Sequence, residues 1–165
     1  MSEPSSLRVL IVEDGDEYLE NLRRFVIGPH YLQAHSGDEA IARLSREPID
    51  ILYLDMRFDR IPTADLMGDL DAATREHNGD SLRALRFLQN NQGLFILEGL
   101  RRAGFGHVPV ILSYDFSREP KRWIHLKGIH PSLAWVPDAV SPGEISALMH
   151  QLRPPQPRVA KDACD

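Results

Sequence analysis

Short apolar runs of strand length alternate with helical patterns along this chain, and this alternation limits the folds open to it. The runs are "LRVLIV" (7–12), "YLQAH" (31–35), "ILYLD" (51–55), "VPVILS" (108–113) and "LAWV" (133–136). Between them, apolar residues recur at the spacing of one helix face. Near-continuous apolar runs are typical of strands covered on both faces. The pattern therefore predicts an α/β fold, a doubly wound parallel sheet with helices on both sides.

Helix start signals support this interpretation. Ser36 with Glu39, and Ser141 with Glu144, have the spacing of a capping box, in which the two side chains satisfy free backbone N–H groups at a helix start. Two further segments, 63–77 and 81–91, also look helical, and we expect Thr63 and Ser81 to cap them. These two segments follow the third strand and predict a helical insert there.

The composition excludes several classes of protein. A chain of 165 residues is long enough for one domain with a sizeable core. The formal net charge of -5 gives no electrostatic support for binding nucleic acid or anionic membranes. Cys164 is the only cysteine, which excludes a disulfide framework and a cysteine-rich metal site. The first residues, "MSEPSSLRVL", have neither a basic start nor a long apolar run, so we expect a cytoplasmic protein without a membrane segment.

Acidic residues follow the two strands that should lie at the centre of the sheet. Glu13 and Asp14 come after the first strand, and Asp55 ends the third. The carboxyl ends of parallel strands meet at one edge of the sheet, where sites of this fold class lie. Two such charges about 5 Å apart repel by roughly 3 kcal/mol at an effective dielectric of 20. We therefore expect a cation here, Mg²⁺ by preference because it favours carboxylate oxygens, or Mn²⁺ or Ca²⁺ in its place.

The ordered motifs "VLIVEDGDE", "AHSGDEAIARL", "DILYLDM", "VPVILS" and "SPGEISALM" cover most of the chain. Together they make it similar to the receiver domain of two-component response regulators. The resemblance implies a flavodoxin-like sheet of five parallel strands in the order 2-1-3-4-5. It implies one receiver-like domain over residues 5–153, with a helical insert at 59–92 between the third strand and the third helix. Residues 154–165 lack periodicity, and we expect a disordered tail there.

The resemblance also implies roles for individual residues. Asp55 is the acceptor of a phosphoryl group from a histidine kinase or phosphotransfer protein. The metal ligands are Glu13, Asp14, Asp55 and the backbone carbonyl of Arg57. Such a metal would supply the charge neutralisation and positioning that phosphoryl transfer needs.

Two more implied roles concern the response to phosphorylation. Ser113, at the end of the fourth strand, would donate a hydrogen bond to the phosphoryl group. Trp135, in the fifth strand, would be the aromatic switch that fills the space Ser113 vacates. A local change of charge would in this way become a change of surface.

The sequence departs from the receiver pattern in three places. Asp138 stands where the family has a lysine, so attraction to a phosphoryl group would become repulsion, worth roughly 2 kcal/mol at about 8 Å and an effective dielectric of 20. Tyr114 follows Ser113, where the family has a small residue that leaves room for the phosphodonor. The third departure is the long insert beside Asp55, which could cover the site or present a surface to a partner.

Two functions remain open from the sequence. One is a stand-alone receiver in phosphorelay signalling, in which metal-dependent phosphoryl acceptance at Asp55 drives protein contacts, with a possible homodimer through the fourth helix, fifth strand and fifth helix. The alternative is an atypical, phosphorylation-independent pseudo-receiver that binds a partner protein through its insert. Catalysis would extend at most to self-phosphorylation and dephosphorylation at Asp55. We expect no output domain, so the output would be protein–protein contact.

Overall fold

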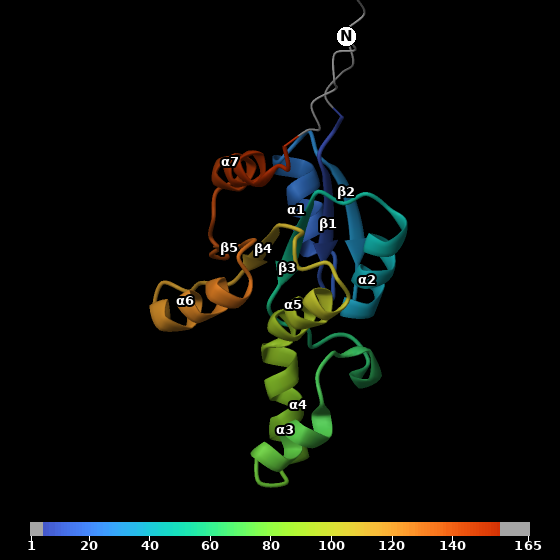
Figure 1. Ribbon diagram of the computed structural model, residues 1–165, viewed down its shortest axis with the longest axis vertical. Helices are drawn as coiled ribbons and strands as arrows, with labels where there is room; N and C mark the ends of the chain where they lie inside the picture. The colour runs from blue at the N-terminus through green and yellow to red at the C-terminus, as the bar shows by residue number, and fades with distance from the viewer. Residues whose placement is uncertain (1–4, 156–165) are drawn as a thin grey trace, which may run out of the picture.

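The computed structural model describes residues 5–155, which form one parallel sheet covered by helices on both faces (Figure 1). The strands are β1 (Arg8–Val12), β2 (His30–Ala34), β3 (Ile51–Asp55), β4 (Val110–Ser113) and β5 (Leu133–Val136). Their order is β2-β1-β3-β4-β5, and every neighbouring pair is parallel. The α/β fold and strand order predicted from the sequence are confirmed.

Five helices pack on the two faces of the sheet. They are α1 (Glu17–Phe25), α2 (Gly37–Arg46), α5 (Gln92–Arg102), α6 (Pro120–Ile129) and α7 (Pro142–Leu152). Residues of α1 and α7, including Leu22 and Ile145, share one buried cluster with Ile11 of β1. Helices α2, α5 and α6 contribute to the cluster on the opposite face, which contains Leu10 and Leu52. Alternate residues of one strand therefore serve two cores, as expected for a sheet buried on both faces.

Both predicted capping residues are the N-caps of their helices. The Ser36 hydroxyl accepts a hydrogen bond from the Glu39 N–H at 3.1 Å, at the start of α2. The Ser141 hydroxyl accepts one from the Glu144 N–H at 3.2 Å, and the Glu144 carboxylate accepts from the Ser141 N–H, so this capping box is complete.

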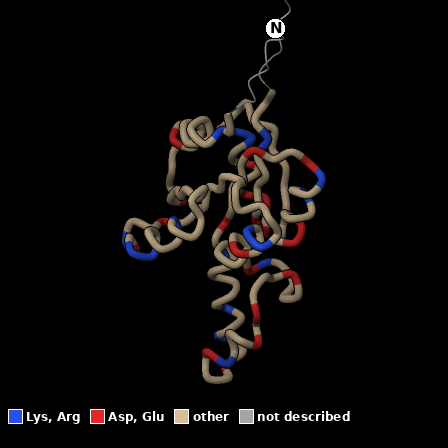
Figure 2. Tube along the Cα trace, viewed as in Figure 1, with Lys and Arg blue, Asp and Glu red and all other residues tan. Residues whose placement is uncertain are grey.

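The insert lies between β3 and α5 and extends away from the sheet (Figure 1). It holds a short 3₁₀ helix, η1 (Thr63–Asp65), and two helices, α3 (Leu70–Glu76) and α4 (Ser81–Asn90). Figure 2 shows residues of both charges along it. Its helices share a small core of their own, formed by Ala73, Ala84 and Leu88 with Leu70 and Phe95 packed against it.

The predicted caps of the insert helices are wrong. Gly68 has φ of 109°, a left-handed conformation that interrupts the expected helix 63–77, so Thr63 begins only the 3₁₀ turn. Asp69 instead caps α3, where its carboxylate accepts a hydrogen bond from the Ala72 N–H at 2.9 Å. Asp80 caps α4 in the same way, and Ser81 is the first helical residue. In both helices the N-cap is therefore the aspartate directly before the first helical residue, whose carboxylate accepts a hydrogen bond from an N–H group of the first turn.

One residue at the start of α5 fastens the insert to the sheet. The Gln92 side chain is fully buried, and its amide accepts a hydrogen bond from the Met67 N–H at 2.7 Å and donates one to the Met67 carbonyl at 3.0 Å. The Met67 side chain fills the space over Gly37 of α2 and Gly99 of α5, where a Cβ atom would collide with its sulfur. The segment after β3 is therefore fixed across the outer helices.

The sequence also predicted a disordered tail after the domain and no membrane segment. Residues 154 and 155 have no regular structure, and the rest of the expected tail lies outside the described residues. Within residues 5–155, no helix is both long and apolar enough to cross a membrane.

Candidate functional site

The candidate site lies at the carboxyl edge of β1, β3 and β4. Asp55, the last residue of β3, is paired in register with Ser113, the last residue of β4. Glu13 and Asp14 directly follow β1, which is the other neighbour of β3. The sheet order thus brings the four polar residues predicted from the sequence to one edge, as the rule for parallel sheets requires.

Glu13 is buried and acts as a helix cap. Its side-chain oxygens accept hydrogen bonds from the Tyr18 N–H at 3.1 Å and the Leu19 N–H at 3.0 Å, in the first turn of α1. Asp16, the residue that precedes α1, makes no side-chain capping bond. Burial raises the pKa of Glu13 to about 7, although the two N–H donors act in the opposite direction. Both oxygens of this carboxylate are therefore already used by the backbone of α1.

Asp14 is held by the root of the insert. One of its carboxylate oxygens, Oδ2, accepts hydrogen bonds from the backbone N–H groups of Asp59 at 2.9 Å and Arg60 at 3.0 Å. The other, Oδ1, accepts from the Arg60 guanidinium at 3.1 Å. Burial alone would raise the pKa of Asp14, but these donors hold it below its ordinary value. The same guanidinium pairs with Glu17 and lowers the pKa of that carboxyl to about 2.

Asp55 is the least engaged acid of the site. Its only hydrogen bond from within residues 5–155 is a long one, 3.5 Å from the Arg57 N–H. Burial raises the pKa of Asp55 to about 6, and the neighbouring charges of Asp14 and Asp138 add to this rise. The site therefore favours the neutral form of this carboxyl more than water does.

Ser113 is buried and forms two contacts with other side chains. Its hydroxyl lies 2.9 Å from the Tyr18 hydroxyl and donates a hydrogen bond to the Asp138 carboxylate at 3.3 Å. Burial raises the pKa of Tyr18, and the charge of Asp55 acts in the same direction. Asp138 therefore faces the site with its carboxylate.

The donor set does not fit a divalent cation in this arrangement. Among residues 5–155 no group of three His, Cys, Asp or Glu side chains is placed to hold a metal ion. The expected ligands Glu13 and Asp14 are close to Asp55, since their charges affect one another's pKa. However, hydrogen bonds already occupy the carboxylates of Glu13 and Asp14. Mg²⁺ binds carboxylate oxygens at about 2.1 Å in near-octahedral geometry, so it would have to compete with these donors, and the roles of the expected metal ligands stay predictions.

Two aromatic residues of the predicted site point toward α6. Trp135 packs against Phe116 and Trp123, with ring centroids 5.9 Å and 6.4 Å away. The Tyr114 hydroxyl donates a hydrogen bond to Glu119 at 2.8 Å, and the Arg122 guanidinium lies over its ring. The switch role of Trp135 and the steric role of Tyr114 stay predictions.

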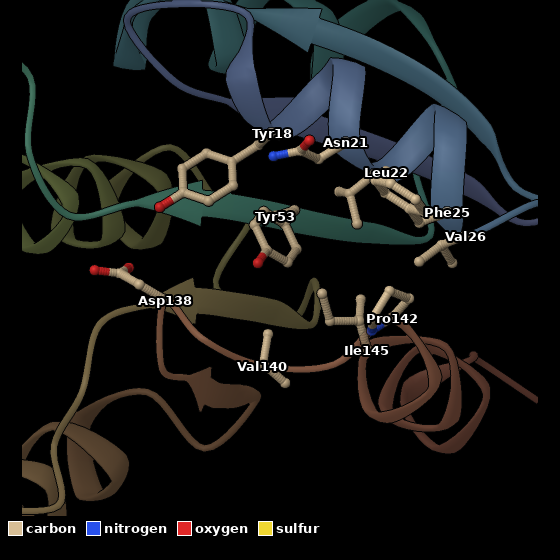
Figure 3. A pocket seen from close by; sticks show the side chains of 10 residues that line it. All are labelled: Tyr18, Asn21, Leu22, Phe25, Val26, Tyr53, Asp138, Val140, Pro142 and Ile145. Atoms are coloured by element: carbon tan, nitrogen blue, oxygen red, sulfur yellow. The ribbon is translucent and has the colours of Figure 1, made fainter.

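A cavity of about 250 Å³ opens beside the site, between α1 and α7 (Figure 3). Tyr18 and Asp138 lie at one end of it, next to Ser113, whereas Phe25 and Val26 lie at the other end. Tyr53 of β3 lines its floor, and burial raises the pKa of Tyr53 to about 12. The acidic edge therefore continues into a largely apolar hollow on the α1–α7 face.

Comparison with solved structures identifies the fold. The chemotaxis protein CheY4 of Vibrio cholerae matches with a TM-score of 0.60 and 12% identity, over 90% of this chain and 99% of that one. The receiver domain of the Francisella response regulator 1452 matches with a TM-score of 0.58 and 16% identity, over 88% and 95%.

A third match is the signal receiver domain of a LuxO-type repressor from Vibrio parahaemolyticus, with a TM-score of 0.58, 12% identity and 89% of both chains covered. No protein-family model matches the sequence, and no curated protein sequence matches it either. These matches confirm that this chain has the fold of response regulator receiver domains.

Sequence reasoning missed three residues that decide the site. Arg60 and Tyr18 pair with residues far from them in the chain, Arg60 with Asp14 and Tyr18 with Ser113. Gly93 allows α5 to start against the end of β3. A Cβ at Gly93 would lie 2.7 Å from the Asp55 carbonyl oxygen, too close for any other residue. The only sequence signal was the position of Arg60 in the loop that follows Asp55, which by itself is typical of an exposed residue.

Proposed function

We propose that this chain is a receiver-fold protein-interaction module that works without phosphoryl acceptance at Asp55. The observation that carries the proposal is the position of Asp138. Its carboxylate accepts a hydrogen bond from Ser113, so an acid rather than a cation stands beside the hydroxyl that would donate a hydrogen bond to a phosphoryl group on Asp55. A phosphoryl dianion on Asp55 would meet this charge, and repulsion of roughly 2 kcal/mol for each unit of phosphoryl charge, at about 8 Å and an effective dielectric of 20, opposes it.

The state of Ser113 supports the same proposal. Its hydroxyl is paired with both Tyr18 and Asp138, so a phosphoryl group on Asp55 would have to replace these contacts to gain a hydrogen bond. In a receiver that responds to phosphorylation, the hydroxyl moves to a new anion. In this protein the Ser113 hydroxyl already donates a hydrogen bond to an anion, the Asp138 carboxylate.

The insert is the best candidate for the partner surface. On α4, Leu82 is 58% exposed and Phe87 is 40% exposed, with Arg83 and Arg86 on the same exposed side of the helix. Aromatic and arginine side chains are the residues most enriched in protein interfaces. The partner would be another protein, with an apolar surface and acidic residues at its rim.

Phosphoryl acceptance at Asp55 is the second candidate function. The pairing of Asp55 with Ser113 in register and the few contacts of the Asp55 carboxylate favour it. In this function a carboxylate oxygen of Asp55 would attack the phosphorus of a phosphohistidine, and the phosphorus–nitrogen bond would break. A histidine kinase or phosphotransfer protein would be the donor partner.

Intact-mass spectrometry after incubation with acetyl phosphate and Mg²⁺ separates the two functions. We expect the unmodified protein to gain no phosphoryl mass under conditions that label a working receiver, and to match its Asp55→Asn variant. Rapid stoichiometric addition that disappears in Asp55→Asn would overturn the proposed function in favour of the second candidate.

A further inference from the structure

The acidic edge contains a positive charge that belongs to the insert. The Arg60 guanidinium donates to Asp14 at 3.1 Å and to the two carboxylate oxygens of Glu17 at 2.6 Å and 2.9 Å. Two acids from the β1–α1 segment thus share one guanidinium from the β3–α5 segment. Paired donors of this kind match the planar fork of arginine, which a lysine could not reproduce.

The backbone around Arg60 is fixed as well as its side chain. Phe58, two residues earlier, is fully buried in the main core, and its N–H donates to the Gln89 carbonyl of α4 at 3.0 Å. This anchor directs the next two N–H groups, those of Asp59 and Arg60, at Oδ2 of Asp14. The contact is therefore built from main-chain and side-chain donors together, and the side chain of Asp14 is only 3% exposed.

A divalent cation would have to displace these donors. Asp14 receives three hydrogen bonds, and both oxygens of Glu13 are engaged by α1. Binding a metal would also place it beside the guanidinium of Arg60, so like charges would repel. Part of the charge that a metal would neutralise, that of Asp14 and Glu17, is already balanced by Arg60.

We infer that Arg60 is the resident cation of this site, and that it excludes divalent metal while fastening the insert to the sheet. The acids after β1, which resemble a metal-binding pair in sequence, serve here as the attachment point of the insert. This inference concerns what occupies the acid pair and does not depend on whether Asp55 accepts a phosphoryl group. It goes beyond the proposed function in assigning Arg60 a role.

Calorimetric titration with Mn²⁺ alone tests the inference. Arg60→Met keeps much of the side-chain length but removes the charge and the donors. We expect it to bind Mn²⁺ at least about tenfold more tightly than the unmodified protein, a change of about 1.4 kcal/mol. Arg75→Met is the matched control, because it is the same substitution at an exposed position of the insert and Arg75 forms no ion pair among residues 5–155. The control should bind Mn²⁺ as the unmodified protein does.

The unmodified protein provides a test that does not depend on the folding of Arg60→Met. We expect its response to Mn²⁺ to equal that of its Asp14→Asn variant, because Arg60 keeps Asp14 from the metal. Tight Mn²⁺ binding by the unmodified protein that Asp14→Asn abolishes would overturn the inference. Equal Mn²⁺ affinity of folded Arg60→Met and Arg75→Met would overturn it too.

Discussion

In the sheet, Leu10, Leu52 and Ile111 are fully buried between two layers of helices, whereas the insert has a core of only three buried residues. The insert is attached to the main body by the polar contacts of Gln92 with Met67 and of Arg60 with Asp14. Three of its partly buried side chains also pack against the main core, those of Ile61, Leu66 and Met67. Apolar burial is not directional, but hydrogen bonds are. The comparison teaches that the sheet supplies stability, while the insert depends on a few specific contacts for its position.

Removing apolar volume should have the largest effect on the free energy of unfolding, and the loss should be greater in the sheet than in the insert. Leu52→Ala leaves a cavity in the middle of the sheet, and we expect a loss of about 3 kcal/mol in the free energy of unfolding. Leu88→Ala, in the small core of the insert, should cost about 2 kcal/mol, because that core has room to collapse around the change. Urea denaturation measures both. Equal or greater loss for Leu88→Ala would mean that the insert is packed as firmly as the sheet.

Removing the amide of Gln92 should release the insert root. Gln92→Ala leaves the N–H and carbonyl of Met67 without their partners, and we expect the free energy of unfolding to fall by about 2 kcal/mol. Amide hydrogen exchange across residues 56–69 should rise at the same time. Gln89→Ala, one turn away, is the control and should change stability by less than about 0.5 kcal/mol. Unchanged exchange in the Gln92 variant would show that other contacts hold this segment.

The sequence predicted the sheet well because apolar runs encode it locally. The run 7–12 contains β1, and the run 51–55 coincides with β3. The same reasoning placed Glu13, Asp14 and Asp55 at one edge, because strand order alone determines that. Asp138 also faces this edge, as expected for a residue at the position of the lysine in the receiver pattern.

The occupants of the acidic edge could not be predicted in this way. The bond of Arg60 to Asp14 joins positions 46 residues apart, and the contact of Tyr18 with Ser113 joins positions 95 apart. No periodic pattern encodes such a pair, and an arginine in a loop is ordinarily solvated. The insert caps were missed for a local reason, since an aspartate next to each helix competed with the predicted Thr63 and Ser81.

The burial of Glu13 predicts a pH dependence of stability. Burial raises its pKa from 4.5 in the unfolded chain to about 7 in the folded one. Between these values the folded state binds more protons than the unfolded state, so the free energy of unfolding falls as pH rises from about 4.5 to about 7. Glu13→Gln should make this fall shallower in urea unfolding curves recorded across the range. An unchanged slope in the variant would mean that Glu13 ionises as freely in the fold as in water.

The smallest stability effect is expected on the exposed face of the insert. Leu82 is 58% exposed, so Leu82→Ala should change the free energy of unfolding by less than about 0.5 kcal/mol. Thermal unfolding of the variant beside Leu88→Ala measures the contrast within one helix. A large loss for Leu82→Ala would mean that this side chain serves the packing of the insert and not a partner surface.

The central claim is that the negative charge of Asp138 opposes phosphorylation of Asp55. The rate of phosphoryl incorporation from acetyl phosphate tests this claim most directly. Asp138→Lys replaces the acid beside Ser113 with the cation of the receiver pattern. It should remove a repulsion of roughly 2 kcal/mol and add an attraction. We expect intact-mass time courses in Mg²⁺, recorded in the Arg60→Met background so that the metal can bind, to show at least about tenfold faster labelling with Asp138→Lys than without it, and no labelling once Asp55→Asn is added. Equal rates, or rapid labelling of the unmodified protein, would contradict the account.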